Sequence, residues 1–352
     1  MINLGIIGFG FMGKTYAYAA KVLSFFYPDA PKVNIKSVVT SSEKTAKAVS
    51  ARYGIDAFSD IDSVISDKEI DAVYIASPNK FHFDHIKRAI EGNKHILCEK
   101  PMVLNLKEAD EVCSLVRDKG LVNHIVFEYR YIPAIMKIKE LISQNAIGDI
   151  TQFRALYLHG SYADPQRPMS WRLTEQSGAL MDLGPHVIDL VNFLIDPIVK
   201  VTSKKVTKIQ ERPKVKGGKE YQAVNTDDIT WLLCETESGI SGSIETSRLS
   251  TGCVDDLRLE IHGEKGAFRF SLENLNYVEY YNGKTGGGFI KIPTLQNYPG
   301  ADFPPPKVSA GWLRAHIHTL YLFLKAIKDI DYGANFEDGY AVQKVIEQSK
   351  DK

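Results

Sequence analysis

Short apolar runs alternate with longer amphipathic segments along the first third of the chain. The apolar runs cover residues 4–7, 35–39, 72–75, 95–98 and 122–127. Apolar positions at helical spacing lie between them, at 12–22, 43–53, 81–91 and 106–119. Strands that alternate with helices in this way form a parallel sheet with helices on both faces. We therefore predict a doubly wound α/β domain here, with the proline-containing segment 24–32 as a loop.

Capping signals support these helix boundaries. Asn105, followed three residues later by Glu108, is typical of an N-cap with its capping-box partner. Gly92 and Gly120 stand where helix C-caps are expected.

The pattern changes to alternation with period two beyond residue 131. The alternating runs cover residues 151–159, 199–209, 229–235, 240–247, 257–262 and 267–270. Such alternation is typical of a largely antiparallel sheet with one buried face. Helical segments are predicted at 134–144, 178–194, 313–328 and from 338 onward, and the Gly- and Pro-rich segment 281–306 is predicted to be a loop.

Two domains follow from these two patterns. Residues 1–127 are predicted to form an N-terminal α/β domain with a parallel sheet. Residues 128–352 are predicted to form a C-terminal α+β domain with a largely antiparallel sheet. An arrangement in which the C-terminal helices pack back on the first domain stays open.

Composition narrows the class of partner. The 352 residues include 43 Lys+Arg and 43 Asp+Glu, so no net charge favours nucleic acid or an anionic membrane. The four cysteines have no metal-ligand spacing and are expected to be reduced thiols of a cytoplasmic protein, with no metal site. Neither a leader pattern nor an apolar run of membrane-spanning length is found. A small diffusing molecule is the expected partner.

The first apolar run leads directly into a G-x-G-x-x-G turn formed by Gly8, Gly10 and Gly13. Such a turn brings main-chain N–H groups and a helix N-terminus against a pyrophosphate, so we predict a dinucleotide. The alternative is a packing turn without a ligand. The residues predicted to contact the cofactor here are Gly8, Phe9, Gly10, Phe11, Met12 and Gly13.

The end of the second strand bears on which nicotinamide is bound. An acidic residue at this position usually bonds the ribose 2′-hydroxyl. Here Thr40, Ser41 and Ser42 follow the strand, with no carboxylate before Glu43 and with Lys44 nearby. These hydroxyls would accommodate a 2′-phosphate and would also tolerate a free hydroxyl. The predicted cofactor is NAD(P), with a preference for NADP.

Two further strand ends carry polar residues, and ligands in parallel α/β sheets lie beyond the carboxyl ends of the strands. The first is Ala76-Ser77-Pro78-Asn79 with His82, predicted to contact the cofactor; an ordinary turn is the alternative. The second is Glu99-Lys100-Pro101, where Lys100 would donate to a substrate oxygen and a cis proline would fix its direction. A solvated surface lysine is the alternative.

The third chemical element is a helix that carries Asp182 and His186. The four-residue spacing places both side chains on one face if Pro185 does not break the helix. A histidine with a nearby carboxylate is suited to act as a general base near neutral pH. A surface ion pair is the alternative, and Asp189 is expected to cap or pack.

These segments resemble the Gfo/Idh/MocA family of oxidoreductases, named for glucose–fructose oxidoreductase and inositol dehydrogenase. The resemblance covers nearly the whole chain. It is carried by the segments Gly8/Gly10/Gly13, Ser77-Pro78-Asn79 with His82, Glu99-Lys100-Pro101, Tyr129-Arg130-Tyr131, Trp171-Arg172 and Gly178…Asp182…His186. It departs from the inositol dehydrogenase pattern at 40–42, where an acidic residue is often found.

The resemblance implies that residues 1–127 form a Rossmann, NAD(P)-binding domain. It implies that residues 128–352 form a substrate-binding α+β domain, whose open, mostly antiparallel sheet forms homodimers or homotetramers. Lys100, Asp182 and His186 match the catalytic set and are expected to bind substrate, and Glu99, Arg130, Trp171 and Arg172 are expected near the cofactor, with Arg172 also near the substrate.

Further substrate-binding residues are expected from their proximity to this motif. They are Tyr157 and His159, with Tyr162, Asp164 and Arg167 in the same polar stretch.

The predicted reaction is hydride transfer between nicotinamide and a secondary alcohol or carbonyl of a sugar, polyol or related small molecule. One alternative is an enzyme that retains its cofactor, for oxidoreduction between sugars or NAD-dependent glycoside hydrolysis. The other is a non-catalytic regulator that senses a dinucleotide, which would have no need of a proton-transfer set.

Overall fold

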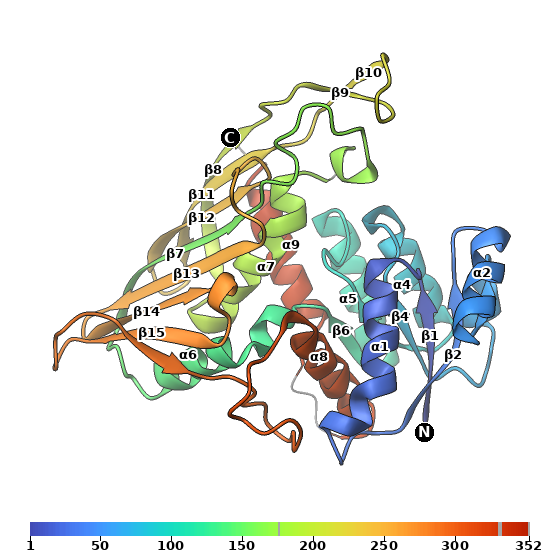
Figure 1. Cartoon of the computed structure of the whole chain (residues 1–352), viewed down its shortest axis with the longest axis horizontal. Coiled ribbons are helices and arrows are strands. Elements are labelled where there is room, and N and C mark those ends of the chain that lie inside the picture. The colour runs from blue at the N-terminus through green and yellow to red at the C-terminus, as the bar shows by residue number, and fades with distance from the viewer. Residues whose placement is uncertain (175–176, 330–332, 351–352) are drawn as a thin grey trace. The chain divides into compact units, whose positions relative to one another are not determined.

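A computed structural model describes residues 1–174, 177–329 and 333–350 (Figure 1). The chain divides into two compact units: the first comprises Met1–Tyr131 and Gln296–Gln343, and the second Ile132–Leu295 and Lys344–Lys352. The sequence places the boundary at 127/128, a few residues earlier. Residues 296–343 group with the first unit, as in the arrangement that the sequence left open for the C-terminal helices.

The first unit is built on a six-stranded sheet in which every pair is parallel, in the order β3-β2-β1-β4-β5-β6. Its strands are β1 Ile2–Ile7, β2 Val33–Val39, β3 Asp56–Phe58, β4 Ala72–Ile75, β5 His95–Cys98 and β6 Asn123–Ile125. This order confirms the predicted Rossmann fold. Only β3, a three-residue edge strand too short to show periodicity, is absent from the prediction.

Helices connect these strands and complete the core of the unit. They are α1 Phe11–Phe26, α2 Glu43–Tyr53, α3 Asp62–Ile65, α4 His82–Glu91, α5 Leu106–Lys119, α8 Trp312–Ala326 and most of α9 Phe336–Gln348. Leu23 of α1 shares one buried cluster with Leu320 and Phe323 of α8. The expectation of a loop from residue 24 is wrong at its start, because α1 continues to Phe26.

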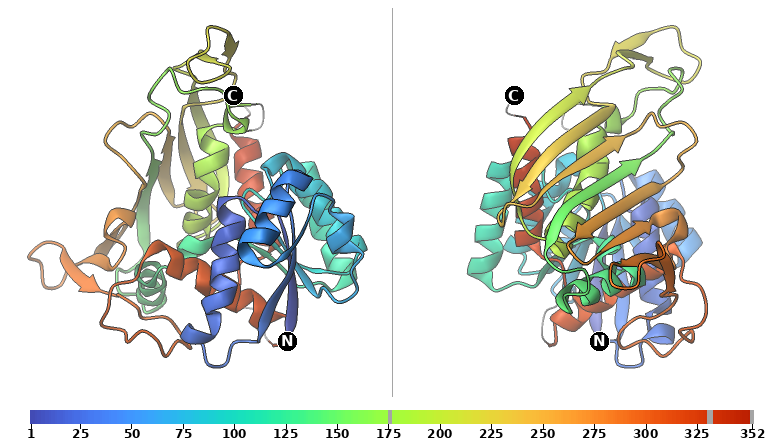
Figure 2. Two further views of the ribbon diagram at one scale, coloured as in Figure 1. Left: turned by 45° about the vertical axis from the view of Figure 1, so that its right-hand side comes forward. Right: turned by 90° about the vertical axis from the view of Figure 1, so that its left-hand side faces the viewer.

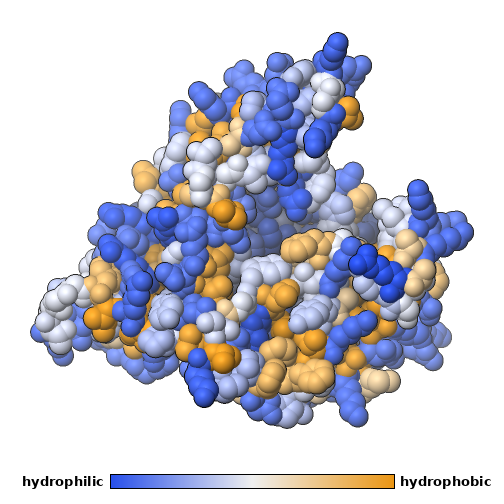
Figure 3. Space-filling view, in the orientation of Figure 1, coloured by the Kyte–Doolittle hydropathy of each residue, from blue (hydrophilic) through white to orange (hydrophobic). Residues whose placement is uncertain are grey.

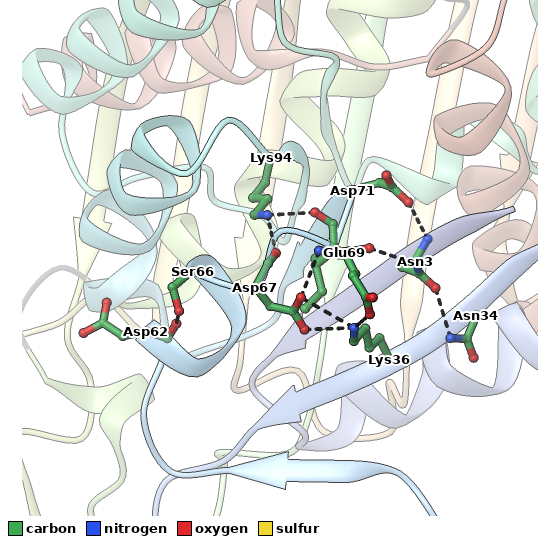
Figure 4. Close-up of polar contacts among 10 residues, drawn as sticks. Asn3, Asn34, Lys36, Asp62, Ser66, Asp67, Glu69, Asp71 and Lys94 are labelled. Carbon is green, nitrogen blue, oxygen red and sulfur yellow. Dashed lines mark hydrogen bonds and ion pairs between the residues drawn. The ribbon is translucent and has the colours of Figure 1, made fainter.

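Charged side chains form ion pairs and hydrogen bonds at the end of this sheet where β1 and β2 begin (Figure 4). Lys36 forms ion pairs with Asp67 and Glu69. Lys94, which is buried, donates to the carbonyl oxygens of Asp67 and Ile70 at 2.7 and 2.8 Å. These contacts hold the loop before β4. The charged side chains at this end of the sheet therefore stabilise the fold, and they lie at the opposite end from the carboxyl ends of the strands.

The second unit is built on an eight-stranded sheet in the order β16-β15-β14-β13-β7-β12-β11-β8 (Figure 2, right). Its strands are β7 Ile150–Leu158, β8 Ile198–Val206, β11 Ile229–Thr236, β12 Ser241–Ser247, β13 Asp256–Gly263, β14 Gly266–Ser271, β15 Tyr277–Asn282 and β16 Ile290–Pro293. All neighbours are antiparallel except β7 and β12. This arrangement confirms the predicted open, mostly antiparallel sheet.

Other elements of this unit lie beside the sheet or extend from it. They are α6 Pro133–Ser143, α7 Ala179–Leu194 and the small hairpin of β9 Glu211–Pro213 and β10 Tyr221–Ala223. The predicted loop 281–306 is partly wrong, because β15 ends at Asn282 and β16 follows at Ile290. Gly286, Gly287 and Gly288 have positive φ and form the tip between these strands, so the glycines mark a hairpin.

Hydrophilic and apolar residues are interspersed on the face shown in Figure 3. Within the described part of the chain, no helix combines the length and apolar character needed to cross a membrane. The same residues contain no group of three or more His, Cys, Asp or Glu side chains placed to hold a metal ion. All four cysteines are free thiols, and three of them are buried.

Candidate active site

The three glycines of the first turn are required for different reasons. Gly8 has φ +100°, and a Cβ there would lie 2.5 Å from the carbonyl oxygen of Ala76. A Cβ on Gly13 would collide with the carbonyl oxygen of Gly8. Gly10 has negative φ, and a Cβ there would meet nothing within 4 Å. Packing therefore explains Gly8 and Gly13, whereas Gly10 faces open space.

The N-terminus of α1 fits a dinucleotide pyrophosphate. Gly10 is its N-cap, and no side chain caps the first turn. Uncapped amides at a helix N-terminus attract phosphate. Phe9 is buried with its ring 5.4 Å from that of Tyr53, and Phe11 is 72% exposed with its ring 5.5 Å from that of Trp312. The turn thus offers main-chain groups and the exposed ring of Phe11 to a cofactor.

The hydroxyls after β2 are engaged in local structure. The Ser42 hydroxyl caps α2 by accepting from the main-chain N–H of Thr45 at 3.3 Å. The Thr45 hydroxyl in turn accepts from the main-chain N–H of Ser42 at 3.2 Å. The hydroxyl of Thr40 donates to the carbonyl oxygen of Ser42 at 3.1 Å. Ser41 is exposed between them.

Two strand ends are joined by a buried histidine. His82 has one ring nitrogen 2.8 Å from the carbonyl oxygen of Pro101 and the other 2.9 Å from that of Ser77. Its imidazole is fully buried, so it holds the loops after β4 and β5 together. The hydroxyl of Ser77 lies 2.9 Å from Nδ1 of His85. The Lys100–Pro101 peptide bond is cis.

Glu99 directs its side chain into the core of the first unit. Tyr74 donates to Glu99 Oε1 at 2.5 Å. Burial raises the pKa of Glu99 to about 7, although the hydrogen bond from Tyr74 opposes the rise. Any contact of Glu99 with a cofactor would therefore come from its main chain. Arg130 is also buried and forms an ion pair with Asp338 at 2.8 Å.

In the second unit, Asp182 and His186 lie one turn apart on α7. The helix is continuous through Pro185. Its N-terminus is held by Asp227, whose carboxylate accepts from the N–H of Leu180 at 2.8 Å and whose carbonyl accepts from that of Ala179 at 2.8 Å. These two bonds satisfy amides that a helix N-terminus leaves without intrahelical partners.

Two arginines face the carboxylate of Asp182. Arg248 Nη2 donates to Asp182 Oδ2 at 3.1 Å, and Arg172 Nε lies 3.7 Å from the same oxygen. The guanidinium of Arg172 also lies 4.3 Å from the ring centre of Trp171. Because both arginines are cationic, they favour the ionised form of the Asp182 carboxyl.

The surroundings of His186 come from one edge of the sheet. The rings of Tyr157 and His186 are 5.7 Å apart, edge to face. Tyr157 donates to Asp255 at 2.6 Å, and His159 Nε2 lies 3.1 Å from the same carboxylate. Since β7 and β12 run parallel, the residues after both strands lie at this edge, where β13 begins.

The second unit thus brings together the predicted residues Tyr157, His159, Trp171, Arg172, Asp182 and His186. Tyr162 instead lies in a small buried cluster with Leu173 and Val224. Asp164 accepts from the N–H of Gln166 at 2.8 Å, and Arg167 covers the ring of Tyr162 at 4.3 Å. These three residues shape their own loop.

Sequence reasoning missed Arg248 and Asp255, which contact predicted site residues, and Asp227, which caps the helix that carries Asp182 and His186. Arg248 and Asp255 stand at the ends of predicted strands, which was the available signal. Asp255 reaches Tyr157 and His159 because β13 pairs with β7, and Arg248 reaches Asp182 on α7 from the end of β12. Alternation of polar and apolar residues specifies neither strand pairing nor helix packing.

Comparison with known proteins places both units in one family. Residues 2–127 match the family model described as oxidoreductase family, NAD-binding Rossmann fold. Residues 135–269 match the GFO/IDH/MocA C-terminal domain.

Relatives of known activity match most of the chain. Levoglucosan dehydrogenase of Pseudarthrobacter phenanthrenivorans is 32% identical, across 97% of this chain and 93% of that protein. The scyllo-inositol 2-dehydrogenase (NAD(+)) of Bacillus subtilis is 26% identical, across 84% and 81% of the two chains. A solved structure of levoglucosan dehydrogenase with NADH and levoglucosan covers 99% of this chain and 97% of that one, with a TM-score of 0.93 and 32% identity. The chain therefore belongs to the Gfo/Idh/MocA family of NAD-binding oxidoreductases.

Proposed function

We propose that this protein is an NAD(P)-dependent dehydrogenase that oxidises a secondary alcohol of a sugar or polyol and reduces the corresponding ketone. The observation that carries the proposal is the pair Asp182 and His186, one turn apart on a continuous helix, with the Asp182 carboxylate facing two arginines. A dinucleotide-sensing module would not need such a pair. The activities of the relatives support a carbohydrate-like substrate.

Each catalytic residue has one role. His186 accepts the proton of the reacting hydroxyl as the general base. Asp182 orients the imidazole and stabilises its positive charge. Lys100 donates a hydrogen bond to the reacting oxygen and stabilises negative charge that develops there. The nicotinamide, when bound, supplies the site that receives the hydride from the same carbon.

The geometry of the glycine turn supports the proposed cofactor-binding residues of the first unit. Main-chain N–H groups of 8–13 would hold the pyrophosphate, and 76–79 would lie along the cofactor. Arg130, Trp171 and Arg172 are proposed to border the nicotinamide or the substrate. The absence of a carboxylate among Thr40, Ser41 and Ser42 supports acceptance of NADP, with preference over NAD. Binding constants for the two cofactors measure this preference.

The setting proposed for the enzyme is cytoplasmic and homo-oligomeric. Four free thiols fit a reducing compartment. On β11, Trp231 and Leu233 are 40% and 66% exposed and alternate with buried residues, so one sheet face carries exposed apolar side chains. A homodimer or homotetramer through this sheet would cover them. Sedimentation velocity measures the oligomeric state.

A substrate panel tests the proposed function. Levoglucosan, scyllo-inositol, D-xylose and D-glucose 6-phosphate are each mixed with the protein and either NAD⁺ or NADP⁺, and formation of reduced nicotinamide is followed by absorbance. We expect at least one sugar to give steady turnover. Cofactor that stays bound through gel filtration, with no net reduction, would instead indicate the internal redox cycle of a cofactor-retaining enzyme. Cofactor binding without any turnover would indicate a regulator.

A further inference from the structure

Arg248 is a buried arginine that contacts two parts of the candidate active site. It follows β12 directly and is 1% exposed. Its main-chain N–H donates to the carbonyl oxygen of Asp228 at 2.9 Å. Its guanidinium donates from Nη2 to Asp182 at 3.1 Å and from Nη1 to the carbonyl oxygen of Arg172 at 2.8 Å. One side chain therefore joins α7 to the loop that carries Arg172.

Because the Arg248 guanidinium is buried, it depends on the ion pair with Asp182. Removing a guanidinium from water is costly unless a carboxylate and further acceptors compensate for it. Asp182 provides the carboxylate, and its side chain is 22% exposed. The ring of Tyr162, 5.0 Å from the guanidinium carbon, adds a cation–π contact. Arg172 is 45% exposed and lies farther from Asp182, at 3.7 Å, so it restrains that carboxylate less.

We propose that Arg248 is a positioning residue, which fixes the Asp182 carboxylate in its ionised form and in one orientation so that Asp182 can direct His186. The inference rests on the proposed function, in which Asp182 and His186 serve proton transfer. Because Arg248 also bonds the carbonyl of Arg172, it sets the position of that loop relative to the carboxylate within the second unit.

Two cationic side chains of the second unit, Arg172 and Arg248, face this carboxylate. His186 lies one turn along α7, and Asp227 binds the N-terminus of the same helix, with Lys205 near Asp227. Without Arg248, one of these two cations is lost, and the more exposed Arg172 is left beside Asp182. The ionised form of the Asp182 carboxyl is then less stabilised.

Arg212 provides a matched control. It is 0% exposed, and its guanidinium donates to the carbonyl oxygens of Asp164 and Tyr162 at 2.7 and 2.6 Å. It also lies 5.9 Å from the ring centre of Tyr162. Arg212 therefore supports the same loop and ring from a buried position, but its hydrogen bonds go to main-chain carbonyls, whereas Arg248 bonds Asp182.

The test compares Arg248→Gln and Arg248→Lys with Arg212→Gln and Arg212→Lys, using the best sugar of the panel. Arg248→Gln should lower kcat about ten- to a hundredfold, a loss that does not exceed the ~10²–10⁴ that acid–base catalysis contributes. In the pH profile of kcat for this variant, the acidic limb should move to higher pH. Arg248→Lys keeps the charge, so its loss should be smaller and its acidic limb should stay in place. The Arg212 variants should lower Tm and leave this limb unchanged.

A double-mutant cycle separates positioning from support of the fold. In an Asp182→Asn background, Arg248→Gln and Arg248→Lys should lower kcat no further. Losses that add to that of Asp182→Asn, or a pH profile like that of wild type, would overturn the inference. If Arg248→Gln does not fold, Arg248→Lys in the same cycle decides. If Asp182→Asn itself retains full kcat, the proposed function fails, and that result is distinct from failure of the role of Arg248.

Discussion

At the scale of single residues, the G-x-G-x-x-G motif contains glycines with different physical causes. Gly8 and Gly13 are required by the path of the main chain, because a Cβ on either would press against a carbonyl oxygen. Gly10 has open space on its side-chain side. The sequence predicted that all three contact the cofactor and that they serve the tight turn, the close approach to phosphate and the helix–strand packing. The structure shows that packing requires Gly8 and Gly13.

Substitution by alanine tests this difference between the glycines. Gly10→Ala should lower the free energy of unfolding by less than about 1 kcal/mol, since an N-cap glycine is only modestly better than alanine. It should raise the Kd of NADH or NADPH by about tenfold or more, equal to ~1.4 kcal/mol. Gly13→Ala should cost about 1–3 kcal/mol of stability through overpacking. Thermal melts and cofactor titration measure both quantities, and unchanged affinity in a folded Gly10→Ala protein would contradict the account.

The charged residues of the second unit show where residue-level prediction ends. Asp182 and His186 could be predicted because their spacing within one helix places them on one face. Arg248 and Asp255 could not be assigned to this site, because each reaches its partner through contacts between segments far apart in the chain. Arg248 reaches α7 from the end of β12, and Asp255 meets Tyr157 through the pairing of β13 with β7. Alternation shows which side chains are buried and leaves strand order undetermined.

At the scale of elements, α7 is the helix on which the proposed chemistry depends. Its N-cap is Gly178, at φ +116°, and the capping acceptor comes from Asp227, just before β11. The same carboxylate accepts from the hydroxyl of Thr230 at 2.8 Å. The local sequence predicted the extent of α7 closely, but it gave no sign that the cap is supplied from outside the helix.

Removing this cap should affect both stability and activity. Asp227→Ala should lower the free energy of unfolding by about 1 kcal/mol and should also lower kcat, because α7 carries Asp182 and His186. The control is Asn105→Ala, which removes the 3.0 Å cap of α5. That change should cost a similar ~1 kcal/mol and leave kcat unchanged. Denaturant melts measure the free energy of unfolding of both variants, and steady-state kinetics measure kcat. Equal effects of both variants on kcat would contradict a specific role for the α7 cap.

Element prediction succeeded for the amphipathic helices and the apolar strands, and failed for the three-residue edge strand and the glycine-rich hairpin. The bounds of α2, α5, β4 and β5 were predicted to the residue. The three-residue strand β3 and the hairpin of β15 and β16 were missed. In both cases the strand is too short, or too close to glycines, for its alternation to be distinguished from loop composition.

At the scale of the whole molecule, each unit carries a different part of the proposed chemistry. The first contains the glycine turn and Lys100 on a parallel sheet, and the second contains Asp182 and His186 beside a mostly antiparallel sheet. The fold class could be predicted because the two hydrophobic periods differ between these regions. The identity of the sugar could not, since it depends on side-chain positions around the reacting carbon.

The rate of hydride transfer in a single turnover tests the central claim most directly. Protein saturated with cofactor and with the best sugar of the panel is compared with Lys100→Met and His186→Ala, after titration shows that each still binds the cofactor. His186→Ala should lower the rate by ~10²–10⁴, the contribution of general acid–base catalysis, and Lys100→Met should also lower it. Wild-type rates in both variants would contradict the assignment of these residues to the reaction.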